Sequence, residues 1–188
     1  MTLVYGLLGL AAAVVLYVIV TYNALVKLRV QVSEAWSDIE VQMKRRYNLI
    51  PNLVETVKGY AKHEAGTLEA VTRARNEAMA NQGAPHEQAQ SENMLTGALK
   101  SLFALAESYP ELKANTSFLN LQEQLAEVED KIQAARRYYN GSVRDNNTKI
   151  DQFPSNLVAR QFSFEKAEFF ELDDADSAAR QPVNVSFD

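Results

Sequence analysis

The feature that most constrains this chain is an uncharged apolar run near its N-terminus, LVYGLLGLAAAVVLYVIV at residues 3–20. At 1.5 Å per residue, a helix of this length reaches about 27 Å, close to the thickness of a bilayer's hydrocarbon core. Extending the helix through Tyr22 makes it long enough to cross this core, and Tyr17 and Tyr22 are suited to the membrane–water interface. The run therefore predicts a transmembrane helix.

A cleaved signal peptide is the alternative explanation of this run. Such a peptide carries basic residues ahead of its apolar segment, and no Lys or Arg precedes Lys27. The helical pattern also continues past Tyr22 without a break. We therefore expect an uncleaved anchor over residues 1–22.

The positive charges beside the anchor predict its orientation, because cytoplasmic flanks carry an excess of Lys and Arg. The N-terminal flank offers only the α-amino group, whereas Lys27 and Arg29 lie close on the other side. We expect a short N-terminus outside and the body of the protein in the cytoplasm.

Beyond the anchor, apolar residues recur every three or four positions, close to the heptad period of a coiled coil. The residues of this stripe are Leu25, Leu28, Val32, Trp36, Ile39, Met43, Tyr47, Ile50, Leu53 and Val57. Leu68, Val71 and Ala78 extend it, so we expect one helix from the anchor to about residue 80. Pro51 predicts a kink in this helix but not its end.

Few other positions interrupt the helical pattern, because the chain has only 7 Gly and 5 Pro. Residues 81–92, with Gly83 and Pro85, predict a loop. A second helix follows and ends near Tyr109-Pro110.

A third helix extends from about Phe118 to Ile150 in the apolar pattern, and Phe153-Pro154 marks its end. Asn115, Thr116 or Ser117 could cap its start, and Ser155 or Asn156 could cap a short last helix. The third helix either runs back towards the membrane along residues 25–60 or folds back on itself.

Striped helix faces must bury against one another, which predicts an all-α fold. We expect the transmembrane helix to continue into an antiparallel four-helix bundle of the up-and-down type. The predicted divisions are the anchor (1–22), the bundle (23–160) and a tail (161–188). Six of the 8 Phe lie at or after Phe153, and residues 171–188 carry four of the chain's five net negative charges. The tail either docks on a neighbour as a strand, through Val183, Val185 and Phe187, or is a frayed terminus.

The sequence offers little for catalysis or for cofactors. With no Cys and only His63 and His86, thiol chemistry is excluded and imidazole chemistry is limited. His63-Glu64 resembles half of a zinc motif, but Thr67 stands where the second His would lie. We expect no enzyme activity, no metal, no cofactor and, given the mild acidity, no nucleic-acid partner.

The basic cluster Lys44-Arg45-Arg46 is the densest in the chain. It lies about 36 Å along a helix from the anchor, well beyond the screening length of roughly 8 Å. We therefore expect ion pairs between helices, with the acids Glu127, Glu129 and Asp130 as partners. Trp36 and Tyr139 are expected to fill the core.

Several long ordered blocks, over about residues 1–172, resemble the LemA family of bacterial membrane proteins. They are YNALVKLR (22–29), AWSDIEVQMKRRYNLIPNLVETVKGYAKHE (35–64), YPELKAN (109–115), FLNLQEQLAEVEDKIQAARRYYN (118–140) and FPSNLVA (153–159). The resemblance leaves out the 81–92 loop and the acidic tail. It implies one transmembrane helix at the inner membrane, an all-α bundle and no established enzyme activity.

The family's signature positions are polar for the most part. In this chain they are Arg45, Arg46, Asn48, Pro51, Asn52, Glu55, Arg137, Tyr139 and Asn140. They form either a buried network that fixes the helix register or a contact surface.

Three functions follow from these expectations. The first is a membrane-anchored scaffold that self-associates, or that organises envelope proteins or membrane shape, since one branch of the family is linked with magnetosome membrane formation. The second is an adaptor for a membrane metallopeptidase, another envelope protein or a signalling protein. The third is a hydrolase, which would need a pocket lined by Arg45, Glu55 and Tyr139.

Overall fold

The computed structural model describes residues 1–172, and all regular structure in that part of the chain is helical. The helices are α1 (Thr2–Tyr60), α2 (Ala65–Ala80), α3 (Pro85–Ala106), α4 (Pro110–Lys113), α5 (Thr116–Asp151) and α6 (Ser155–Gln161). An all-α fold with one long apolar N-terminal helix was expected and is confirmed. The proposed strand at Val183–Phe187 lies outside the described residues.

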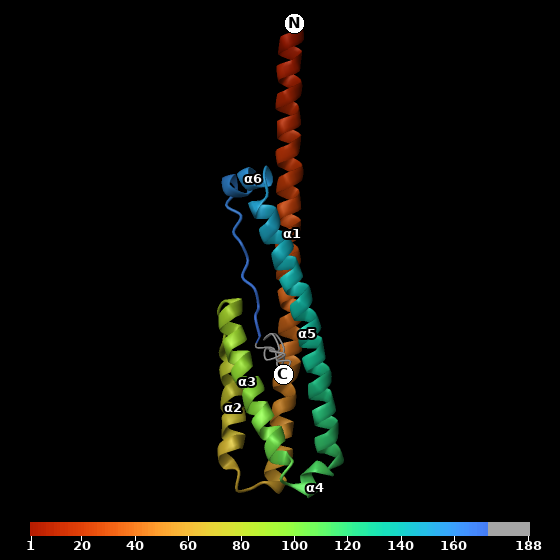
Figure 1. Cartoon of the computed structure of the whole chain (residues 1–188), viewed down its shortest axis with the longest axis vertical. Helices are drawn as coiled ribbons and strands as arrows, with labels where there is room; N and C mark the ends of the chain where they lie inside the picture. The colour runs from red at the N-terminus through yellow and green to blue at the C-terminus, as the bar shows by residue number, and fades with distance from the viewer. Residues whose placement is uncertain (173–188) are drawn as a thin grey trace, which may run out of the picture. The chain divides into compact units, whose positions relative to one another are not determined.

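Helix α1 continues for 59 residues without interruption, and Pro51 lies inside it (Figure 1). Its N-terminal segment has a mean hydropathy of 2.6 over an 18-residue window, none of which is buried by the protein itself. By length and composition, α1 can therefore cross a membrane, and among the described residues it alone meets that test.

The expected helix to residue 80 is wrong, because α1 ends at Tyr60 and α2 begins at Ala65. The residues between them form a turn in which the Tyr109 hydroxyl donates a hydrogen bond to Glu64 Oε1 at 3.1 Å. Ala61, Leu68 and Val71 are all buried. The apolar spacing is thus similar on both sides of the turn, which is why the pattern did not reveal it.

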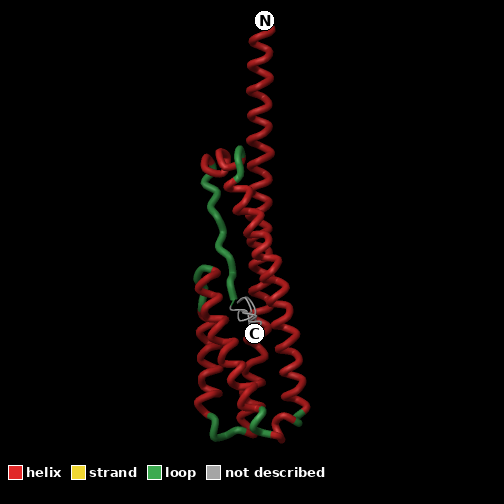
Figure 2. The backbone as a smooth tube through the Cα atoms, viewed as in Figure 1, coloured by secondary structure: helices red, strands yellow, loops and turns green. Residues whose placement is uncertain are grey.

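The expected loop at 81–92 is also wrong, since α3 already begins at Pro85 (Figure 2). Proline suits the first position of a helix, where its missing N–H would have no intrahelical partner. Glu87 Oε2 accepts a hydrogen bond from the Ala84 N–H at 3.3 Å, and Asn81 Nδ2 donates to Ser91 Oγ at 2.8 Å. Only residues 81–84 connect α2 to α3, and the two helices pack against each other as an antiparallel hairpin.

The chain divides into two compact units. The first consists of Met1–Arg46 and Gln124–Phe169, and it pairs α1 with α5. Along this pair Arg46 contacts Glu129, the Trp36 ring lies 5.3 Å from that of Tyr139, and Gln31 Nε2 donates to Ser142 Oγ at 3.4 Å. The residue numbers of the contacts rise along α5 as they fall along α1. Within this unit α5 is therefore antiparallel to α1 and runs back towards the apolar end, which is the first of the two expected paths.

After α5, the remaining residues of the first unit, up to Phe169, turn and run back along α5. A cis Phe153–Pro154 bond precedes α6. An extended segment then follows α5 in the opposite direction (Figure 2). The Asn147 side chain holds it by two hydrogen bonds of 2.9 Å to the backbone of Ala167. The expected cap at Ser155 or Asn156 is wrong: Pro154 is the N-cap, and the Ser155 hydroxyl donates to the carbonyls of Lys149 and Gln152.

The second unit is built on Tyr47–Glu123, which includes α2, α3 and α4. Its apolar contacts include Phe103 and Phe118, whose ring centroids lie 6.2 Å apart. Asn115 caps α5 as predicted, because its Oδ1 accepts the Phe118 N–H at 3.0 Å. Its Nδ2 donates to the Tyr60 hydroxyl at 2.9 Å.

Candidate functional site

The nine signature residues divide by their exposure to solvent. Arg46 and Tyr139 are buried, and Asn140 is partly buried. The exposed residues are Arg45, Asn48, Pro51, Asn52, Glu55 and Arg137. A buried network therefore describes only the smaller part of the set.

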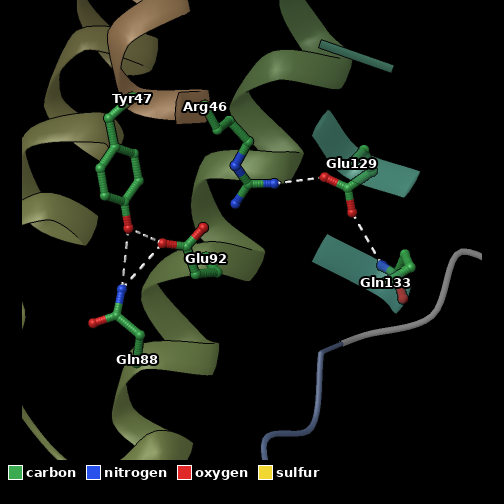
Figure 3. A network of polar contacts seen from close by, with 6 residues as sticks. All are labelled: Arg46, Tyr47, Gln88, Glu92, Glu129 and Gln133. Atoms are coloured by element: carbon green, nitrogen blue, oxygen red, sulfur yellow. Dashed lines mark hydrogen bonds and ion pairs between the residues drawn. The ribbon is translucent and has the colours of Figure 1, made fainter. Parts of the chain in front are cut away.

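Arg46 lies in the first unit and is only 2% exposed. Its Nη1 donates to Glu129 Oε2 at 2.7 Å, and Gln133 Nε2 donates to the other carboxylate oxygen at 3.0 Å (Figure 3). The ion pair expected between the basic cluster and the acids of α5 is thus confirmed for Arg46. A guanidinium inside a helix pair needs such a partner, because desolvation of an unpaired charge is costly.

A second polar cluster lies in the second unit and was missed from the sequence. The Tyr47 hydroxyl donates to Glu92 Oε1, and Gln88 Nε2 donates to the Tyr47 hydroxyl at 3.2 Å and to Glu92 Oε1 at 3.0 Å (Figure 3). All three side chains are buried. Gln88 and Glu92 are four residues apart and share a helix face. That spacing was the available signal, but it lay inside the presumed loop.

Tyr139 fills the core of the first unit as expected. Its ring lies against Trp36, and its hydroxyl donates to the carbonyl of Glu168 at 2.8 Å. Burial, with a smaller contribution from the Glu168 carboxylate, raises the pKa of Tyr139 to about 12. Both effects disfavour the phenolate, so this hydroxyl holds the extended segment and is a poor proton donor or nucleophile at neutral pH.

The exposed signature residues on α1 form one continuous surface. Arg45, Asn48, Asn52 and Glu55 follow one another at intervals of three and four residues, which places them on one side of the helix. We name these four residues the polar α1 face. Glu55 Oε1 forms an ion pair with Lys58 Nζ at 3.5 Å, and both side chains are exposed to solvent. This face offers both signs of charge and two amides to a partner.

The three residues of the hydrolase hypothesis differ in their exposure to solvent. Arg45 and Glu55 are exposed, whereas Tyr139 is buried. One shallow surface hollow is lined by residues of α2 alone, between Glu69 and Ala80. Within residues 1–172, no three His, Asp or Glu side chains gather in a way that could hold a metal ion.

A comparison with protein families matches residues 35–187 to the family described as LemA family. The match includes residues 81–92 and the acidic tail, so the expectation that both lie outside the resemblance is wrong.

Curated relatives agree with this match. The magnetosome protein MamQ 2 of Paramagnetospirillum magneticum is 27% identical over 175 residues, covering 80% of this chain and 64% of the relative. Protein LemA of Metamycoplasma hominis is 28% identical over 152 residues, covering 79% and 68%. The magnetosome protein MamQ of Magnetospirillum gryphiswaldense is 26% identical over 174 residues, covering 79% and 64%. The chain thus spans less than two thirds of the length of the MamQ relatives.

Proposed function

The chain belongs to the LemA family, and we propose that it is a single-pass, membrane-anchored scaffold without catalytic activity. In this proposal it self-associates, or organises bacterial envelope proteins or membrane shape, at the inner membrane. Its N-terminus lies outside and its helical body lies in the cytoplasm, following the positive charges of Lys27 and Arg29.

The observation that carries this proposal is the continuity of α1. One helix includes both the exposed apolar segment and the polar α1 face. No break in the helix separates the two, which suits a scaffold that ties its partners directly to its anchor.

Two further points support a scaffold over an enzyme. Tyr139 is tied to a backbone carbonyl, and Arg46 is tied to Glu129. The residues left accessible therefore suit contact more than chemistry. Two of the relatives are also named magnetosome proteins, which favours a role at a membrane.

We further propose that the body forms an antiparallel four-helix bundle of the up-and-down type and that copies of the chain associate through the polar α1 face. Amides and charges of both signs suit such a contact, because each donor can meet an acceptor on a neighbour.

Site-specific photo-crosslinking tests the proposal in native membranes. A photoreactive amino acid replaces Asn48 or Asn52 on the polar α1 face, and Asn76 on α2 provides a matched control. All three are exposed helical asparagines. We expect crosslinks at positions 48 and 52 to a second copy of the chain and none at position 76.

Mass spectrometry of the adducts distinguishes the scaffold from the alternative. A stoichiometric foreign protein at positions 48 and 52, such as a membrane metallopeptidase or a signalling protein, would favour the adaptor. No adduct at either position, or equal adducts at position 76, would overturn the proposed use of this face.

A further inference from the structure

Helix α6 packs against the part of α1 where the apolar segment ends. Val158 and Ala159 of α6 form a buried cluster with Leu25, and Val18 of α1 packs against that cluster. The Tyr22 ring contacts Phe162 and Phe164, with centroids 4.9 Å and 5.6 Å apart. These contacts place α6 at the level of the last turns of the apolar segment, where Figure 1 shows it beside α1.

The outer side of α6 and its flanks are also apolar. Phe153, Leu157 and Phe162 are 79%, 57% and 49% exposed, although Val158 and Ala159 between them are buried. Among the described residues, only Met1 is a more exposed large apolar residue than Phe153. We name these three residues the α6 patch. Contact with α1 therefore does not account for the apolar character of this segment.

Basic residues surround the α6 patch. Lys27 and Arg29 are exposed on α1, and Arg160 is exposed on α6. The Arg29 guanidinium lies 5.3 Å from the centre of the Phe164 ring. Two acids lie in the same part of the chain: Asp151 is paired with Lys166 at 2.7 Å, and Glu165 is exposed beside Phe164. An apolar surface bordered by cations matches the interface of a bilayer that contains anionic lipids.

We propose that the α6 patch inserts into the interfacial region of the same leaflet from which α1 emerges. The chain then contacts the bilayer twice, through the span of α1 and through Phe153, Leu157 and Phe162. The second contact fixes the rotation of the first unit about the membrane normal, which a single span does not do. This inference goes beyond the proposed scaffold and rests only on the membrane span.

The absence of cysteine from the chain allows a direct test in the full-length protein. Single variants Phe153→Cys and Leu157→Cys are labelled with the fluorophore NBD and reconstituted in phosphatidylcholine–phosphatidylglycerol vesicles. A nitroxide on a shallow acyl carbon of added lipid quenches a fluorophore that lies in the interface. Val41→Cys, exposed on α1 within the first unit, is the matched control, and Val14→Cys reports the span itself.

We expect nitroxide lipid to quench NBD at positions 153 and 157 and to leave position 41 unchanged. If positions 153 and 157 behave like position 41 while position 14 is quenched, the inference is wrong and the anchor stands. If position 14 is not quenched either, the anchor itself fails. If quenching instead increases with the protein-to-lipid ratio and does not depend on nitroxide lipid, the patch contacts a second copy of the chain and the proposal is wrong.

Discussion

At the scale of single residues, polar side chains are buried beside α1 in both units. The Arg46–Glu129 pair lies in the first unit, and the Tyr47–Gln88–Glu92 cluster lies in the second. Buried polar groups stabilise a structure only in the one arrangement that satisfies their hydrogen bonds. The two clusters therefore oppose sliding of the helices by a turn, which apolar stripes alone would tolerate.

The first prediction concerns the Arg46–Glu129 pair. Glu129→Gln removes the charge opposite a buried guanidinium, and we expect the free energy of unfolding to fall by about 1–2 kcal/mol. Glu127→Gln is the matched control two residues away. Lys131 holds the pKa of the Glu127 carboxyl below its usual value, but this pair is exposed, so we expect no resolvable change. Urea unfolding in detergent, followed by circular dichroism, measures both. Equal effects would contradict this account of Arg46.

The second prediction concerns the Tyr47 hydroxyl. Tyr47→Phe keeps the ring but leaves Gln88 and Glu92 short of one buried partner. We expect a loss of about 1–2 kcal/mol in the free energy of unfolding. Tyr138→Phe removes the same atom from an exposed ring and should change it by less than about 0.5 kcal/mol. The same urea titration compares the two variants, and a neutral Tyr47→Phe would show that the cluster adds nothing.

The third prediction is a pH dependence that arises from Tyr139. Its folded pKa of about 12 exceeds its usual value of 10.0, so the folded state holds this proton more tightly than the unfolded state. The resulting stability is complete below pH 10 and is lost as the pH rises towards 12. The stability advantage of the wild type over Tyr139→Phe should therefore narrow between pH 10 and pH 12. Thermal unfolding of both proteins across that range measures it, and a constant gap would contradict the assignment.

At the scale of elements, the sequence predicted the helices better than their ends. The Asn115 cap was predicted correctly, because a cap is a local feature of the sequence. The break between Tyr60 and Ala65 has only Gly59 and Gly66 beside it as local signals, and single glycines are also tolerated inside helices. Residues 85–92 were misjudged because three of their four buried residues, Gln88, Ser91 and Glu92, are polar, and the fourth, Ala89, is a weak apolar signal.

The fourth prediction uses a glycine in the middle of an element. Gly97 is exposed inside α3, and a methyl group added there meets nothing within 4 Å. Gly97→Ala should raise the free energy of unfolding by about 0.5–1 kcal/mol, because alanine loses less entropy in a helix. Gly83→Ala is the contrast: its new carbon would meet the Glu87 carboxylate that binds the Ala84 N–H. Melting temperatures rank the variants, and equal gains would be inconsistent with this explanation.

At the scale of the whole molecule, the sequence identified the family and the apolar N-terminal helix. It also favoured an all-α fold, because Gly and Pro are scarce and the stripes are long. It did not decide how the signature residues are used. Arg46 and Asn48 are both polar residues in the same block of sequence, yet Arg46 is buried and Asn48 is exposed. That difference depends on which side of α1 meets α5, and the polar residues themselves do not reveal it.

The fifth prediction concerns orientation in the membrane. Asn76→Cys places the chain's single thiol on the exposed side of α2. If Lys27 and Arg29 keep the body in the cytoplasm, a membrane-impermeant maleimide should label this thiol only after spheroplasts are opened with detergent. The Cys-free parent reports background labelling. Full labelling of intact spheroplasts would reverse the proposed orientation.

The division of the chain has a consequence for how proteins of this kind can diversify. The first unit is assembled from Met1–Arg46 and Gln124–Phe169, so the whole intervening stretch is nested within it as an insertion. Lengthening that stretch by matched amounts on α1 and α5 leaves the pairings of Arg46 with Glu129 and of Trp36 with Tyr139 in place. Because those pairings are made within the first unit, we expect them to be kept when the inserted portion differs in length or sequence.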